Sequence, residues 1–136
     1  MKLIIAFFVV LIGGMLLIQQ GLQNGSVLRY IDRHPHDRGI PAATYYIGES
    51  YYIFQNLPDA TTYFLRVSQR YPDYRLADDA YFAYLQCLDD SLAVPRDQLV
   101  QGYQAYLEKY PAGKHTSMAK NRIDLYRTGQ SLRLPQ

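Results

Sequence analysis

The sequence predicts an all-α protein in which an N-terminal transmembrane helix precedes a short solenoid of helical hairpins. Residues 3–18 form an apolar run without a charge. From residue 26 onward, apolar residues recur every three or four positions, which is the helical period. Proline and glycine separate these stretches, and no stretch alternates with period two for long enough to indicate a strand.

The composition allows one modest core and excludes several classes of function. The chain has 136 residues, of which 49% are hydrophobic and 19% are charged, so it is not predicted to be disordered. Its net charge of +2 comes from interspersed basic and acidic residues, unlike the clustered basic face of a nucleic-acid binder, so no nucleic-acid partner is expected. Cys87 is the one cysteine, which excludes an internal disulfide, N-terminal lipidation and a multi-cysteine zinc site.

The N-terminal run indicates a membrane anchor over residues 1–25. As a helix, residues 3–18 reach roughly 24 Å, somewhat less than the roughly 30 Å hydrocarbon core, and contact with lipid is expected along them. A signal-peptidase site needs small residues of the Ala-x-Ala kind after the apolar run, and Gln23-Asn24-Gly25 fits this motif poorly. The prediction is therefore an uncleaved anchor. A cleaved signal peptide and a soluble core helix are the alternatives.

Lys2 favours an orientation with the N-terminus in the cytoplasm. The expected location is therefore the cytoplasmic membrane, crossed once, with the C-terminal domain in the periplasm. Small residues at a spacing of seven would let another membrane helix approach closely, although such residues also occur without a partner. They are Ala6, Gly13, Gly14 and Gly21.

Five apolar stripes predict the helices of the remaining chain. They are Ala43, Ile47, Tyr51 and Phe54; Ala60, Phe64, Val67 and Tyr71; Ala77, Tyr81, Tyr84 and Leu88; Leu99, Tyr103, Tyr106 and Tyr110; and Ala119, Ile123 and Tyr126. Pro72 and Pro111 are placed to stop helices. Each follows a basic residue and an aromatic ring, as Pro35 also does, and the three prolines are 37 and 39 residues apart. Such a period is typical of a solenoid.

Residues 44–72 resemble a tetratricopeptide repeat. The matching positions are Ile47, Gly48, Tyr51, Ala60, Phe64, Val67 and Pro72. Thr44 stands at the first Trp position, and Val67 is larger than the family's small residue. The second repeat carries Phe82 where a small residue is usual, and about five extra residues near 89–94 lengthen its turn.

The resemblance implies a helical domain over residues 26–128 with a tail over 129–136. The sequence is similar to envelope tetratricopeptide proteins of the BamD type and the Tol–Pal coordinator type. It departs from the BamD type at its anchor, because it lacks the lipid-bearing cysteine.

No constellation predicts catalysis, a cofactor or a metal site. His34, His36 and Asp37 straddle a proline and are interpreted as a polar turn. Cys87 is interpreted as a buried thiol. The pair Asp78-Asp79 falls in a predicted first helical turn, where the helix dipole favours acids, and Asp89-Asp90 falls in a predicted turn.

The resemblance implies a partner-binding concave face on the first helix of each repeat. Its positions are Tyr45, Glu49, Tyr52, Ile53, Asp79, Ala83 and Gln86. Exposed tyrosines offer much contact area at low entropy cost. The alternative is that these rings pack against other segments of the chain itself.

The expected function is a membrane-anchored adaptor in a bacterial envelope that binds a protein partner or serves as an accessory subunit of a membrane or periplasmic complex. The alternative is an enzyme with a site between helices.

Overall fold

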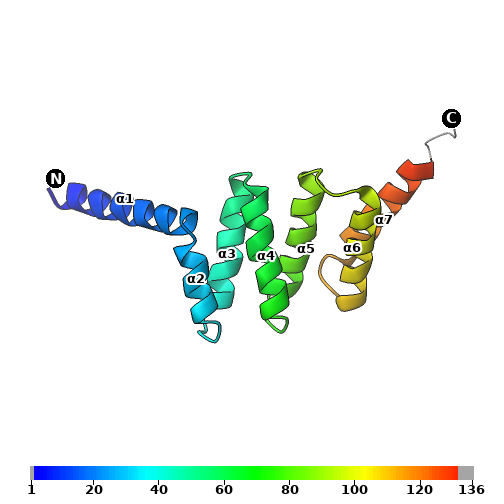
Figure 1. The fold of residues 1–136 in the computed structure, drawn as a ribbon, viewed down its shortest axis with the longest axis horizontal. Helices are drawn as coiled ribbons and strands as arrows, with labels where there is room; N and C mark the ends of the chain where they lie inside the picture. Colours follow the sequence, from blue (N-terminus) through cyan, green and yellow to red (C-terminus); the bar gives the residue numbers. More distant parts are fainter. Residues whose placement is uncertain (1, 132–136) are drawn as a thin grey trace. The chain divides into compact units, whose positions relative to one another are not determined.

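The computed structural model describes residues 2–131 and, within them, the side chains of residues 7 and 10–129. All regular structure in residues 2–131 is helical, which confirms the all-α class for this part of the chain (Figure 1). The helices are α1 Lys2–Gln23, α2 Ser26–Arg33, α3 Ile40–Ile53, α4 Leu57–Arg70, α5 Ala77–Asp90, α6 Arg96–Lys109 and α7 Thr116–Ser131. Residues 132–136, within the predicted tail 129–136, lie outside the described residues.

The chain divides into two compact units, residues 1–40 and residues 41–136. The first unit holds α1 and α2. Gly25 between them has a φ of 70°, a left-handed conformation that glycine adopts without strain. The Asn24 Oδ1 accepts a hydrogen bond from the backbone N–H of Ser26 at 3.0 Å, so the turn also supplies a partner for the start of α2.

The prediction that residues 3–18 span a membrane is wrong. No helix among the described residues is long and apolar enough to cross a bilayer. The apolar run is shorter than the hydrocarbon core, and α1 continues through the polar Gln19, Gln20 and Gln23. The predicted single-pass location in the cytoplasmic membrane depended on that span and is wrong with it. The periplasmic placement of the C-terminal domain was inferred from the same span and loses that support.

The small residues proposed for membrane-helix packing have different surroundings. A Cβ added at Gly13 or Gly14 would meet nothing within 4 Å, whereas one at Gly21 would lie 3.3 Å from a methyl group of Val27. Gly21 therefore allows α1 and α2 to approach, while Gly13 and Gly14 face open space. The side chain of Ala6 lies outside the described ones.

The second unit consists of the hairpins α3–α4 and α5–α6, followed by α7 (Figure 1). As predicted, α4 ends before Pro72 and α6 ends before Pro111. At the start of α4, the Asn56 side chain accepts a hydrogen bond from the backbone N–H of Asp59, and Pro58 occupies the first turn. Local sequence thus sets where the hairpin helices begin and end.

The stripe predicted on α4 is confirmed, but the one on α3 is not. Ala60, Phe64 and Val67 are fully buried and pack with Ala80 and Cys87. On α3, however, Thr44 and Gly48 are buried and Ala43 is exposed.

Phe54 is 79% exposed, since it falls one residue beyond the end of α3 at Ile53, where helical spacing no longer sets its direction. The buried face of α3 is therefore shifted by one residue, to Thr44 and Gly48 instead of the predicted Ala43 and Ile47.

A second core cluster joins α5, α6 and α7, and the predicted stripes on α6 and α7 are confirmed. On α5 the prediction is only partly right, because Tyr81, Tyr84 and Leu88 are half-buried while Phe82 and Leu85 are buried. Its buried residues are Phe82, Leu85, Leu99, Tyr103, Tyr106, Ala119 and Ile123. Phe82, the residue larger than the family pattern, is 2% exposed and stacks on the ring of His115 at 4.4 Å. The extra volume of Phe82 thus serves the packing of α5 against the α6–α7 turn.

Gly48 offers a test of the first hairpin's packing. A Cβ there would lie 3.0 Å from two ring carbons of Phe64 and 3.2 Å from the Cβ of Tyr63. Because both neighbours are fully packed, we expect Gly48→Ala to destabilise the fold, and Gly48→Leu to do so more strongly; overpacking typically costs about 1–3 kcal/mol. Urea denaturation would measure the loss. Gly39→Ala is the control, because a Cβ there meets nothing within 4 Å; equal stability of the two alanine variants would contradict the packing.

Candidate partner-binding face

The predicted concave face draws its residues from α3 and α5, the first helices of the two hairpins. These helices hold five carboxylates and no basic residue, and two of the carboxylates, Glu49 and Asp79, belong to the predicted face. The carboxylates are Glu49, Asp78, Asp79, Asp89 and Asp90.

Tyr45 lies half-buried near the start of α3. Its ring packs against Phe64 with centroids 5.7 Å apart and meets Tyr46 edge-on at 5.4 Å. Burial raises the pKa of Tyr45, and the charges of Glu49 and Asp79 raise it further. The structure therefore brings Tyr45 close to a carboxylate of its own helix and to one of α5.

Tyr52 connects the ends of α3 and α5. Its hydroxyl donates a hydrogen bond of 2.7 Å to the carboxylate of Asp90. This bond, followed by burial and the Asp90 charge, raises the pKa of Tyr52 to about 12. Tyr52 is thus held in place by a contact within the chain while its ring remains half-buried.

The α5 side of the predicted face is partly occupied by the chain itself. The Asp79 carboxylate lies 2.7 Å from His115 Nε2 and 3.0 Å from Lys114 Nζ. Burial opposes ionisation of Asp79, but these two contacts outweigh it and lower its pKa. Gln86 and Ala83 are half-buried on α5, and Ile53, 69% exposed, lies at the end of α3.

The main role of the α5 acids is not evident from the sequence pattern. Asp89, 8% exposed, accepts hydrogen bonds from the hydroxyls of Tyr103 at 3.1 Å and of Tyr126, and Arg122 lies 3.6 Å away. Asp89 and Asp90 are the last residues of α5, which corrects their predicted placement in a turn.

At the other end of α5, Asp78 accepts from the Tyr106 hydroxyl and from the backbone N–H of Lys114 at 2.8 Å. The two acid pairs stand eleven residues apart, about three helical turns. Their tyrosine partners lie 14 to 38 residues away along the chain, so local spacing gave no signal for them.

Two other residues considered from the sequence, Cys87 and His34, pack against other parts of the chain. Cys87 is fully buried, and its burial raises the pKa of the thiol to about 11, which suppresses thiolate formation. His34, at the end of α2, stacks on Tyr30 at 4.2 Å, and its Nδ1 lies 2.9 Å from the Tyr30 carbonyl oxygen.

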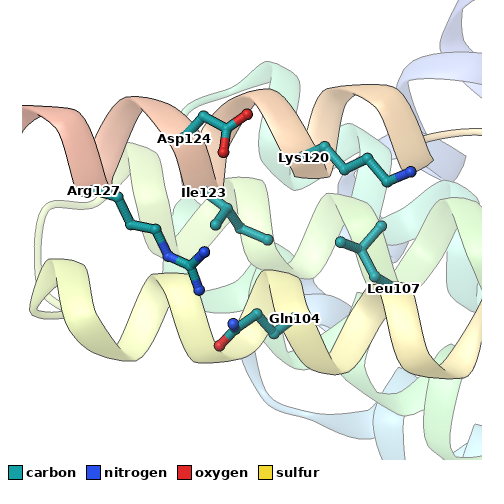
Figure 2. Close-up of a pocket in the computed structure, with 6 residues that line it drawn as sticks. All are labelled: Gln104, Leu107, Lys120, Ile123, Asp124 and Arg127. Carbon is teal, nitrogen blue, oxygen red and sulfur yellow. The ribbon is translucent and has the colours of Figure 1, made fainter.

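A pocket of about 310 Å³ lies between α6 and α7. Figure 2 shows its lining, with Ile123 at the centre and charged side chains of both signs around it. The lining residues are Gln104, Leu107, Lys120, Ile123, Asp124 and Arg127. No motif in the sequence indicates this pocket.

Comparison of the chain with protein-family models and with curated proteins finds no match. The resemblance to tetratricopeptide repeats therefore rests on the residues quoted above and on the hairpin architecture.

Asp89 and Asp90 provide a matched pair for measuring the tyrosine–aspartate bonds. Asp89→Ala leaves the hydroxyls of Tyr103 and Tyr126 without their acceptor, and each such loss costs roughly 1–3 kcal/mol when buried. Asp90→Ala removes one exposed bond from Tyr52, worth about 0.5–1.5 kcal/mol. Chemical denaturation should show the larger loss for Asp89→Ala; the reverse order would contradict the assigned network.

Alkaline titration should report the same bonds. Tyr52 and Tyr126, which donate to Asp90 and Asp89, have pKa values raised to about 12 in the folded chain, against about 10 in an unfolded one. A raised folded pKa contributes stability that is complete below pH 10 and is lost as the pH rises through 12.

Tyrosinate absorbance and helicity should therefore change together above pH 10. Full ionisation of all tyrosines near pH 10 with helicity retained would contradict this expectation.

Proposed function

We propose that the unit from residue 41 onward is a tetratricopeptide-like scaffold that binds a protein partner through the α3–α5 face. That face comprises Tyr45, Glu49, Tyr52, Ile53, Asp79 and Gln86. The observation that carries the proposal is the combination of half-buried tyrosines and carboxylates on the first helices of two successive hairpins.

The internal contacts of the tyrosines support this use. Tyr45 is braced by Phe64, and Tyr52 is braced by Asp90, so both rings are held in fixed positions before any partner arrives. Binding by pre-ordered aromatic side chains avoids much of the entropy cost of ordering an interface. Glu49 adds a half-buried carboxylate between the two rings, since it lies one turn from each.

The same contacts determine which substitutions are informative. Tyr45 and Tyr52 both pack against the core cluster of the first hairpin, so truncating either ring would disturb folding as well as binding. Glu49 and Gln86 are better probes, because changes there leave the rings intact.

The experiment is site-specific photo-crosslinking in the cells that produce the protein. A photoreactive amino acid at Glu49 or Gln86 should capture one defined partner, identified by mass spectrometry. The same group at Glu108, an exposed position on α6, is the matched control and should not capture that partner. Glu49→Gln should reduce capture from position 86 without changing helicity.

Two outcomes would contradict the proposal. One is capture of the same proteins from position 108 as from positions 49 and 86. The other is absence of any crosslinked product while the chain is folded and abundant.

A further inference from the structure

The turns that follow α3 and α5 form one edge of the second unit. The bond between Tyr52, near the end of α3, and Asp90, the last residue of α5, holds the two helix ends together. Both turns lie at the same end of the hairpins, at the top of Figure 1. We call this the turn edge, defined by its exposed apolar residues Ile53, Phe54 and Leu92.

The turn edge is a patch of large apolar side chains in solvent. Ile53 is 69% exposed, Phe54 is 79% exposed and Leu92 is 88% exposed. Together the three side chains, on two turns linked through the Tyr52–Asp90 bond, expose on the order of 400 Å² of apolar surface, comparable in area to patches that often mark interaction sites. Burial of these side chains therefore contributes little to the fold of this chain.

The backbone of both turns is strained in a similar way. Gln55 has a φ of 60° and Leu92 a φ of 53°, a left-handed conformation that disfavours residues with a Cβ. Glycine at position 92 would relieve the strain, and the leucine side chain buries almost nothing in return. Local folding does not account for leucine at this position, whereas a contact made by its side chain would.

The charge around the turn edge is negative. Asp90 ends α5, Asp59 lies in the first turn of α4, directly after the α3–α4 turn, and Glu49 lies one turn before Ile53. Arg96, the first residue of α6, extends toward α7, with its Nη1 3.7 Å from where a Cβ on Gly129 would stand.

We propose that the turn edge docks a segment of another protein in which apolar side chains are flanked by lysine or arginine. The apolar side chains would cover Phe54 and Leu92, and the basic ones would lie beside Asp59 and Asp90, as charge complementarity favours. A second copy of the same edge, or an anionic lipid surface, would instead bring like charges together. The inference rests on the proposed function in that this chain binds proteins, and it names the partner's chemistry and an adjoining surface that shares Ile53 with the α3–α5 face.

The test uses two synthetic amphipathic peptides with leucines in the same helical spacing, one with lysines and the other with glutamates on the polar face. Binding of each labelled peptide to the full chain is measured by fluorescence anisotropy. We expect the lysine peptide to bind at least about ten-fold more tightly, with the difference decreasing as salt screens the charges. A lysine–serine peptide without leucine should bind more weakly than the leucine–lysine one.

Matched variants separate binding from folding. Leu92→Gly removes the side chain and relieves the backbone, so we expect an equal or higher thermal midpoint together with about ten-fold weaker binding of the leucine–lysine peptide. Gln55→Gly relieves the equivalent strain but keeps the patch, and it should bind as the unmodified chain does. Leu125→Ser removes an apolar side chain that is 59% exposed on α7 and should also leave binding unchanged.

A separate double variant tests the contribution of negative charge to peptide binding. Asp59→Asn combined with Asp90→Asn removes two negative charges. It keeps an oxygen acceptor for the Asn56 side chain at position 59 and one for the Tyr52 hydroxyl at position 90. It should reduce the preference for the lysine peptide over the glutamate peptide.

Several results would overturn the inference: unchanged binding by Leu92→Gly, equal binding of the two leucine peptides, or hydrogen-exchange protection by the peptide outside the two turns. A Leu92-dependent dimer in sedimentation would assign the edge to a second copy. Leu92-dependent binding to phosphatidylcholine vesicles would assign it to lipid. Crosslinking from positions 49 and 86 tests the α3–α5 face independently, so either proposal can fail alone.

Discussion

The second unit depends on the hydrogen bonds that tyrosine hydroxyls donate to the aspartates at the two ends of α5. Asp78 holds Tyr106 at the N-terminal end; Asp89 holds Tyr103 and Tyr126, and Asp90 holds Tyr52, at the C-terminal end. Carboxylates at a helix C-terminus are opposed by the helix dipole. Here tyrosine donors, together with Arg122 beside Asp89, compensate for that cost, so α5 is joined to α3, α6 and α7 by polar contacts as well as by apolar packing.

This arrangement accounts for four of the 14 tyrosines, Tyr52, Tyr103, Tyr106 and Tyr126. A tyrosine fills a core as phenylalanine does but also carries a hydroxyl that usually finds a partner when buried. Gly113 shows how closely the chain is fitted around one such bond, since a Cβ there would lie 2.7 Å from the Tyr106 hydroxyl and 3.0 Å from an Asp78 oxygen. The α6–α7 turn therefore needs glycine so that it can pass over the bond.

Helical spacing predicted the parts of the fold that local sequence determines. The ends of α4 and α6 follow from proline, and the buried stripes of α4, α6 and α7 follow from period and residue type. The stripe on α3 was misplaced because Phe54 lies beyond the helix end, and α1 was misassigned because its apolar run is too short to span a bilayer. The partners of the α5 acids lie 14 to 38 residues away, so local pattern could not identify them.

One of these tyrosine–aspartate bonds also links the helical core to the turn edge. Asp90 fixes Tyr52, Tyr52 lies beside Ile53, and the two helix ends so joined carry the turns with Phe54 and Leu92. Apolar side chains that project from turns are usually a liability, because they invite non-specific association. Here they stand next to two helix ends that the Tyr52–Asp90 bond joins, and close to carboxylates. In the proposed docking these carboxylates, Glu49 on α3, Asp59 on α4 and Asp90 on α5, would disfavour self-association and acidic partners, and the joined helix ends would hold the apolar side chains in place.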